Sequence, residues 1–207
     1  MSDFSNLIPF FNSISTSFSD PNFFLEQYST TLEILETYYN FYPATASDII
    51  IDLGIGTGLL SFLAFKKGAK KIIGIDIDKK ALKKAQNNAL ELHIHNLNLI
   101  HSSVEFFNFK KFTNKVNGII MNPPFGTKRK YLDFVFLKKS MLTKAWILTL
   151  HKDNYESDKM ILDLCKINNY IVAHKKNLIY SIPNTHKPHI LTTYPVKVTL
   201  YLLIPNM

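Results

Sequence analysis

Cysteine is almost absent from this chain of 207 residues, and long apolar stretches are missing. The single cysteine, Cys165, cannot form an internal disulfide, which favours a reducing, intracellular location and a buried structural thiol. No apolar run approaches the roughly 20 residues that a bilayer-spanning helix requires, so we predict no transmembrane segment. The N-terminal residues lack a basic cluster before their apolar patch, and we expect no secretory signal. The expected location is the cytoplasm, the nucleus or both.

The histidines are not spaced as metal ligands. His93, His95 and His101 have no accompanying cysteine pattern, so we predict no metal site. The sequence also lacks an obvious His/Asp or Cys/His arrangement for nucleophilic catalysis. The expected chemistry therefore depends on neither a resident metal nor an activated nucleophile.

Positive charge is in surplus. Lysine and arginine number 24 against 16 aspartates and glutamates, which gives a net charge of +8. A surplus of this size favours a polyanionic partner such as nucleic acid. A lysine-rich composition that only keeps the protein soluble explains it equally well, so charge alone leaves both interpretations open.

Strand and helix patterns alternate from residue 48 onward. Short apolar runs typical of buried strands occur at 48–53, 71–75, 96–100, 116–121 and 145–150. Such alternation requires right-handed crossovers and a mostly parallel sheet covered on both faces. The last stretch, through 194–204, alternates apolar and polar residues and predicts antiparallel strands. We therefore predict a doubly wound α/β domain with its ligand at the carboxyl ends of the strands.

The chain length fits one domain, residues 1–207. Residues 1–19 are rich in Ser, Phe and Asn and are expected to be partly mobile. Asp20-Pro21 has the pattern of a helix start, with Asp as N-cap and Pro at the first helical position. The helix is expected to continue through Leu35. It forms an N-terminal segment, 20–45, ahead of a catalytic core over 46–207.

A glycine-rich turn follows the first predicted strand. Residues 52–58, DLGIGTG, have G-x-G-x-G spacing rather than the G-x-G-x-x-G of dinucleotide binders. Glycines let the backbone approach a ligand closely. A second acid, Asp76, ends the next strand, where a carboxylate can accept both hydroxyls of a ribose. Together, turn and acid predict a nucleoside cofactor.

The sequence Asn122-Pro123-Pro124-Phe125 follows the fourth predicted strand. Consecutive prolines cannot extend a sheet, so this loop is expected to be stiff and to lie where ligands bind. The Asn122 side-chain oxygen and the Pro123 carbonyl can each accept one N–H of a planar amino group, and Phe125 can stack on that group. We predict these four residues as the reaction site.

Two family resemblances follow from these motifs. The glycine turn with its acids resembles class I S-adenosylmethionine-dependent methyltransferases, and residues 122–125 resemble the N-P-P-[FYW] signature of amino methyltransferases. That signature is shared by enzymes acting on adenine N6, guanine N2 and glutamine amides. Segments 20–21, 25–30, 121–128 and 150–152, taken in order, are similar to the eukaryotic and archaeal small-subunit ribosomal RNA adenine-N6 methyltransferase family. The similarity covers roughly residues 20–205.

The resemblance implies a seven-stranded class I methyltransferase fold with a C-terminal antiparallel hairpin and an N-terminal helical segment that closes over the cofactor. It implies S-adenosylmethionine as cofactor and S-adenosylhomocysteine as product. Asp52 is expected to hold the cofactor's amino group and Asp76 its ribose. Family members often carry an adenine-binding acid where this chain has Ser102-Ser103-Val104, so Ser103 or a backbone group is expected to substitute. The implied cofactor contacts are Gln27, Tyr28, Thr30, Asp52, Gly54, Gly56, Gly58, Leu59, Asp76, Ile77, Ser103, Val104 and Asn122.

The implied acceptor is an adenosine in small-subunit ribosomal RNA. Basic residues after the reaction loop are expected to pair with phosphates in a salt-dependent way. The resemblance also implies a heterodimer with a small zinc-binding activator protein that pairs with the sheet edge. The expected RNA contacts are Lys128, Arg129, Lys130, His151 and Lys152. A solvated loop is the alternative for the basic run, and a core or surface histidine is the alternative for His151. Five phenylalanines either form an exposed patch or pack under loops, namely Phe10, Phe11, Phe106, Phe107 and Phe109.

Two other functions stay open. A protein methyltransferase acting on a glutamine amide of a termination factor would use the same loop geometry, although the basic residues after the loop favour RNA. A cofactor-binding ribosomal RNA assembly factor without catalysis is the second. The presence of Asp52, Asp76 and Asn122 counts against it.

Overall fold

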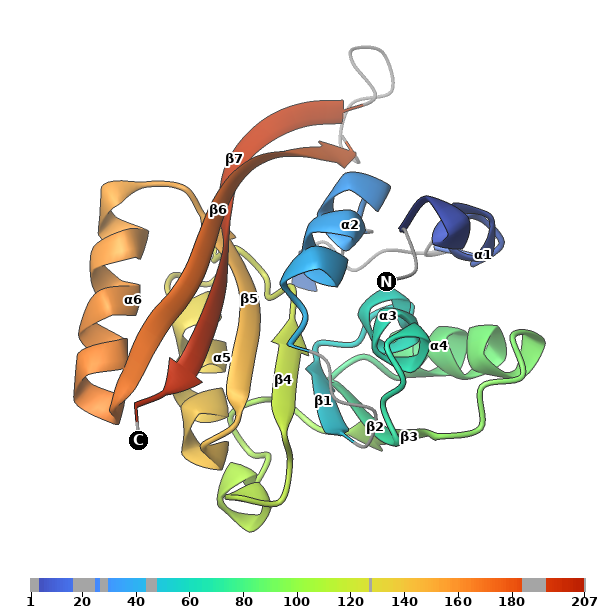
Figure 1. Cartoon of the computed structure of the whole chain (residues 1–207), viewed down its shortest axis with the longest axis horizontal. Coiled ribbons are helices and arrows are strands. Elements are labelled where there is room, and N and C mark those ends of the chain that lie inside the picture. Colours follow the sequence, from blue (N-terminus) through green and yellow to red (C-terminus); the bar gives the residue numbers. More distant parts are fainter. Residues whose placement is uncertain are drawn as a thin grey trace.

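The computed structural model describes residues 4–16, 25–26, 30–43, 48–126, 128–183 and 193–206, without the side chains of 182–183 and 193–194. This part of the chain forms a seven-stranded sheet in the order β3-β2-β1-β4-β5-β7-β6 (Figure 1). Its strands are β1 Ile49–Leu53, β2 Lys71–Asp76, β3 Leu97–His101, β4 Gly118–Met121, β5 Trp146–Lys152, β6 Tyr170–Pro183 and β7 Thr193–Pro205.

The first five strands pair in parallel, and the last two run antiparallel. β1 lies between β2 and β4, with β3 and β5 next outward. β7 pairs antiparallel with β5, and β6 pairs antiparallel with β7. The predicted doubly wound α/β fold with a C-terminal antiparallel hairpin is confirmed.

Helices cover both faces of the sheet because neighbouring residues of a strand point to opposite faces. Ile50 packs in a cluster with α2 and α3, whereas Ile51 packs in a second cluster with α5 and α6. The helices are α1 Ile8–Asn12, α2 Leu32–Phe41, α3 Leu59–Lys66, α4 Lys79–Glu91, α5 Leu132–Ser140 and α6 Tyr155–Asn168. Short 3-10 turns are η1 Phe4–Leu7, η3 Phe109–Phe112 and η4 Met141–Thr143. In the described residues, no helix is both long and apolar enough to cross a bilayer.

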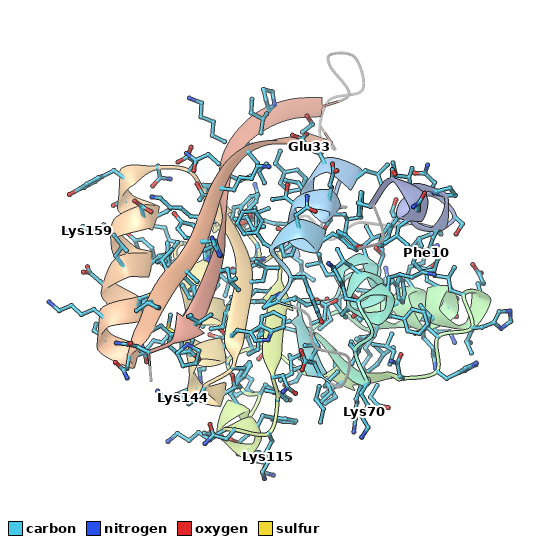
Figure 2. The ribbon with its side chains drawn as sticks, in the orientation of Figure 1. Phe10, Glu33, Lys70, Lys115, Lys144 and Lys159 are labelled. Carbon is cyan, nitrogen blue, oxygen red and sulfur yellow. The ribbon has the colours of Figure 1, made fainter. Side chains whose placement is uncertain are left out.

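Residues 4–16 pack against the domain. Phe4 and Phe11 are buried and stack on each other with ring centroids 5.7 Å apart, and Phe4 also contacts Tyr39 of α2. Phe10 lies at the surface of α1 (Figure 2), with the Lys66 ammonium 3.9 Å from its ring centroid. Residues 4–16 thus bury aromatic surface against α2 and α3, and the expected mobility of residues 1–19 stays a prediction.

The helix expected to run from Asp20 through Leu35 is also corrected. Asp20-Pro21 lies outside the described residues, and Glu26 has a φ of 49°, which no continuous helix allows. α2 begins at Leu32, where the Thr31 side chain caps the helix by accepting from the Ile34 amide. A threonine oxygen at this position satisfies an amide that otherwise lacks a helical partner.

Candidate active site

The glycine turn links β1 to α3 and folds toward β2. Gly54, Gly56 and Gly58 all have positive φ values, of 78°, 55° and 96°. The amides of Gly54 and Ile55 both donate to the Ile75 carbonyl at 2.8 and 3.1 Å. Gly58 is the N-cap residue of α3, and a Cβ there would lie 2.6 Å from the Phe62 ring. The backbone conformation therefore requires glycine, as predicted from the spacing.

Asp76 at the end of β2 stabilises this turn through hydrogen bonds. One of its carboxylate oxygens accepts from the Gly56 amide at 3.0 Å, and the other accepts from the Asp78 amide at 2.9 Å. A carboxylate has about four acceptor positions, so both oxygens keep capacity for ligand hydroxyls. Burial raises the pKa of Asp76, while the two amide bonds oppose that rise. Asp78 caps α4 by accepting from the Lys80 amide.

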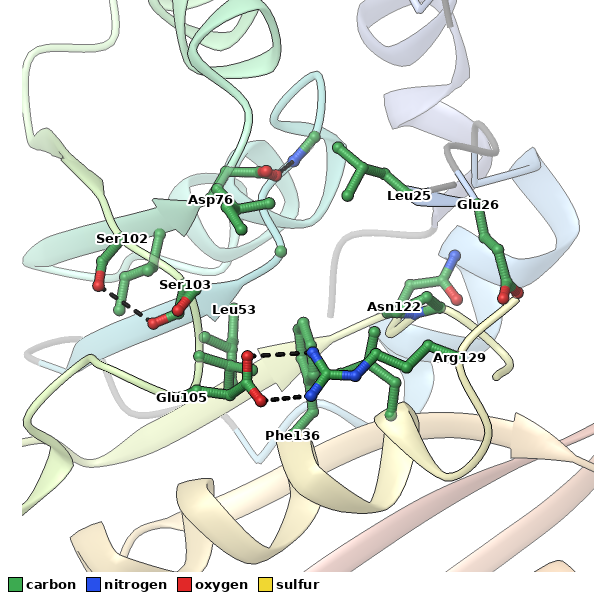
Figure 3. Close-up of a pocket in the computed structure, with 17 residues that line it drawn as sticks. Leu25, Glu26, Leu53, Asp76, Ser102, Ser103, Glu105, Asn122, Arg129 and Phe136 are labelled. Carbon is green, nitrogen blue, oxygen red and sulfur yellow. Dashed lines mark hydrogen bonds and ion pairs between the residues drawn. The ribbon is translucent and has the colours of Figure 1, made fainter. Parts of the chain in front are cut away.

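A cavity of about 210 Å³ opens where β1 to β4 end (Figure 3). Its wall includes seven predicted cofactor contacts, which are Gly54, Gly56, Asp76, Ile77, Ser103, Val104 and Asn122. The other lining residues are Leu25, Glu26, Leu53, Ile75, Ser102, Glu105, Pro124, Arg129, Leu132 and Phe136. Gly58, Leu59 and Thr30 lie outside this wall, and Gln27 and Tyr28 lie outside the described residues. The structure thus gathers most of the predicted cofactor site.

The cavity wall suits an adenosine. Ile77 and Val104 supply apolar side chains for a flat base, and Asp76 supplies a carboxylate for ribose hydroxyls. The Ser103 hydroxyl is buried and has no hydrogen-bond partner within the described part of the chain. An unpartnered buried hydroxyl is costly unless a ligand completes it. Ser103 is therefore well suited to the adenine contact expected of it.

Asp52 does not contribute to the cavity wall. Its carboxyl is 1% exposed and accepts from the Ser61 hydroxyl of α3 at 2.7 Å. Burial raises the pKa of Asp52 to about 7, and the Ser61 bonds only partly oppose this. Asp52 Oδ1 is buried and has no partner among the described residues, so the contact with the cofactor's amino group stays a prediction for a residue outside the cavity wall.

The reaction loop is fixed at its start. The Tyr38 hydroxyl of α2 donates to the carbonyl of Met121 at 2.6 Å. The Asn122 side-chain nitrogen donates to the Thr30 hydroxyl at 3.3 Å and to the Tyr180 hydroxyl at 3.5 Å. Because the Asn122 nitrogen donates to these two hydroxyls, its side-chain oxygen can accept an N–H from a substrate. This is the orientation that the predicted chemistry requires.

Phe125 differs from its predicted role. Its side chain is 5% exposed and meets the Tyr180 ring edge-on at 6.0 Å. It belongs to the core beneath the loop, so it does not present a face for stacking on a substrate. Pro124 lines the cavity, whereas the side chain of Pro123 is buried.

Two acidic residues of the wall were not predicted. Glu26, near the N-terminus, accepts from the Lys128 backbone amide at 2.9 Å and so joins its segment to the loop after Phe125. Glu105 follows β3 and forms a bidentate pair with Arg129, 3.0 Å from Oε2 to Nη1 (Figure 3). Its nearness in sequence to Ser103, two residues earlier, was the only feature of the sequence that placed Glu105 near the site. The pair connects the loop after β3 with the loop after β4.

The predicted RNA contacts fall into two groups. Lys128, Arg129 and Lys130 are exposed beside the cavity, and Lys152 is half-buried at the end of β5. His151 is completely buried, 3.0 Å from both the Asp133 carboxylate and the Thr149 hydroxyl. Its ring stacks on Phe134. Of the two roles expected for His151, the burial agrees with the core histidine, because the imidazole makes buried hydrogen bonds and has no exposed surface for RNA.

The five phenylalanines are mostly packed. Phe11 and Phe109 are buried, and Phe10 and Phe107 are partly buried against the core. Phe106 alone among them is almost fully exposed, at 89%. Packing under loops explains four of the five.

Comparison with known proteins decides the family. The protein-family model for ribosomal protein L11 methyltransferase (PrmA) matches residues 27–123. The rRNA N(6)-adenosine-methyltransferase METTL5 of Danio rerio is 31% identical over 198 residues, which cover 91% of this chain and 93% of that protein. The chain therefore belongs to the same methyltransferase family as METTL5.

Two further similarities bear on fold and substrate. A crystal structure from Pyrococcus horikoshii, PH1948, provisionally described as an RNA methyltransferase, superposes with a TM-score of 0.86 at 26% identity over 100% of both chains. A protein from Methanocaldococcus jannaschii, MJ0928, provisionally described as a protein N5-glutamine methyltransferase, is 39% identical over 93 residues, 42% of this chain and 45% of that protein. Fold and family together establish a class I methyltransferase with S-adenosylmethionine as methyl donor.

Proposed function

We propose that this methyltransferase modifies the N6 amino group of an adenosine in small-subunit ribosomal RNA. The observation that carries the proposal is the position of Asn122. It lines the cofactor cavity at the end of β4, and bonds from its nitrogen to Thr30 and Tyr180 fix its amide. Its oxygen is thereby available to orient an amino group beside the cofactor.

The bound cofactor supplies a methyl group on a positively charged sulfur. The lone pair of an adenine amino nitrogen is delocalised into the ring, so that nitrogen is a weak nucleophile. We propose that the Asn122 oxygen and the Pro123 carbonyl each accept one N–H, which turns the lone pair toward the methyl group. Pro124, in the cavity wall, supplies a flat apolar contact for the base. The proton leaves after transfer, so no strong general base is required.

Charge supports RNA as the acceptor. Lys128 and Lys130 are exposed on the loop that follows the reaction site, and the chain carries a net charge of +8. Basic side chains beside a base-accepting cavity pair with phosphates and position the nucleic acid. The ribosomal RNA activity of the METTL5 relative, which aligns along 91% of this chain, agrees with this choice.

A glutamine amide is the second candidate acceptor. It presents a planar nitrogen to the same two acceptors, and the partial similarity to a glutamine methyltransferase favours it. That similarity spans 42% of this chain, against 91% for the METTL5 relative.

We also propose that a small zinc-binding activator protein pairs with the edge of the sheet. β3 is the outermost strand at one end of the described sheet, and the exposed Phe106 follows it closely. An unpaired strand edge with a nearby aromatic suits strand addition. If the purified chain alone is soluble, monomeric and fully active, this partner proposal fails.

An acceptor competition tests the proposed substrate. The protein, with and without the activator, is incubated with labelled cofactor and equal amounts of small-subunit ribosomal RNA and a termination factor. Label in RNA supports the proposal. Label in the termination factor alone transfers the assignment to the glutamine amide, and cofactor binding without transfer to either, with the activator present, indicates an assembly factor.

A further inference from the structure

Glu26 belongs to the wall of the cofactor cavity, and one of its carboxylate oxygens is buried and unsatisfied. The residue is 7% exposed, and its Oε1 accepts from the Lys128 amide at 2.9 Å. Its Oε2 is buried and has no hydrogen-bond partner among the residues that the structure describes. Burying a carboxylate oxygen without a partner costs more than burying a neutral polar atom. A bound group that donates to Oε2 would remove this cost.

The backbone at Glu26 adds to the case. Its φ of 49° lies in the left-handed region, which a glutamate rarely adopts. Such strain persists where surrounding contacts hold a residue in place, and it gathers at ligand sites. Here the bond from the Lys128 amide fixes the carboxylate of a residue that lines the cavity.

The position of Glu26 indicates which end of the cofactor it meets. Figure 3 shows Glu26 and Asn122 on one side of the cavity and Asp76 on the other. An adenosine held beside Asp76 would leave the methionine end of the cofactor to reach the side of the cavity that Glu26 lines. That end carries an α-ammonium group, a cation with three donors. A carboxylate and an ammonium form the stronger, charge-assisted type of hydrogen bond.

We propose that Glu26 binds the α-ammonium group of the cofactor through Oε2. Glu26 takes the role that the sequence suggested for Asp52, whose carboxyl is buried against Ser61 outside the cavity wall. Because Glu26 also holds the Lys128 amide, cofactor binding there joins the N-terminal segment to the basic loop. The proposal rests on the methyl donor and is independent of whether the acceptor is RNA or protein.

Calorimetry on the ligand-free protein tests this contact with two matched ligands. S-adenosylhomocysteine carries the α-ammonium group, whereas 5′-methylthioadenosine has the same nucleoside and thioether without the amino acid. Glu26→Gln is expected to weaken S-adenosylhomocysteine binding about 10- to 100-fold, the range for a hydrogen bond to a charged group. Binding of 5′-methylthioadenosine is expected to stay unchanged.

Glu105→Gln is the matched control, because Glu105 is the other unpredicted carboxylate of the wall and already pairs with Arg129. It is expected to change the affinities for the two ligands equally or not at all. Equal weakening of both ligands by Glu26→Gln would assign Glu26 a purely structural role and overturn the proposal. Unchanged S-adenosylhomocysteine affinity, with or without a raised KM for the acceptor, would overturn it as well.

Discussion

A hydrogen bond of 3.3 Å joins the Asn122 side-chain nitrogen to the Thr30 hydroxyl, although 92 residues separate them in the chain. The bond connects the segment before α2 with the reaction loop after β4. Tyr38 makes a second connection between the same parts, from α2 to the Met121 carbonyl. The N-terminal segment therefore helps to position the reaction site as well as contributing to the cofactor cavity.

Thr30→Val is expected to lower kcat about fivefold, because it removes one of two hydroxyls that orient the Asn122 amide, and one hydrogen bond is worth about 1 kcal/mol. Cofactor affinity is expected to change little, since Thr30 is outside the cavity wall. Steady-state methyl transfer and calorimetry measure the two effects. Thr30→Ser keeps the hydroxyl and should retain activity. Equal activity of the valine and serine variants would show that the bond has no positioning role.

Asp52 is expected to make stability depend on pH. Burial raises its pKa to about 7, far above the roughly 3.9 of an unfolded aspartate. Between these values the unfolded chain releases a proton that the folded protein keeps. The contribution of Asp52 to the free energy of unfolding therefore falls as pH rises from about 4 to about 7.

Asp52→Asn removes this titration, so the variant should gain stability relative to wild type as pH rises, by up to about 1.4 kcal/mol per pH unit. Urea denaturation of the ligand-free proteins at several pH values measures the difference. Stability curves that stay parallel between pH 4.5 and 7 would contradict the raised pKa.

The His151–Asp133 pair is expected to support stability rather than RNA binding. His151→Leu leaves the buried Asp133 carboxyl without its 3.0 Å hydrogen-bond partner, which should cost about 1–3 kcal/mol. The double variant His151→Leu with Asp133→Leu should recover part of that loss, because it removes the buried carboxyl as well. Chemical denaturation measures both. A stable single variant with weakened RNA binding would restore the contact role that the structure argues against.

The basic loop is expected to set the salt dependence of RNA binding. Lys128→Ala with Lys130→Ala should reduce the slope of log affinity against log salt by roughly 1.4, or 0.7 per phosphate contact on a single strand. Filter binding across a salt series measures the slope. Lys159→Ala, on the exposed side of α6 (Figure 2), is the control and should leave the slope unchanged. An equal reduction of the slope in the loop variant and in Lys159→Ala would indicate a diffuse effect of net charge.

The sheet and the glycine turn were predictable because their signals are local. Apolar runs marked five strands within about two residues of their ends, and the G-x-G-x-G spacing matched three positive-φ glycines. The start of α2 was not predictable in the same way. Asp20-Pro21 and Thr31 are both good caps by residue type, and only the tertiary position of Glu26 and Thr30 beside the reaction loop separates them.

Residue roles at the site were predicted less well than its location. Asp52, Phe125 and His151 lie next to the cavity in sequence, but each side chain is buried. The direction of a side chain at the end of a strand depends on what packs against it, such as Ser61 for Asp52 and Tyr180 for Phe125. Glu26 and Glu105 enter the wall through long-range contacts with Lys128 and Arg129, which no local pattern reveals.

The most direct test of the central claim is nucleoside analysis of methylated RNA. Small-subunit ribosomal RNA is incubated with S-adenosylmethionine, the proposed activator and either wild type or Asn122→Ala, then digested to nucleosides. The account predicts N6-methyladenosine with wild type and a loss of about 100-fold or more with the variant, while S-adenosylhomocysteine binding persists. Methylation of a different nucleoside, or N6-methyladenosine at equal yield from both proteins, would contradict it.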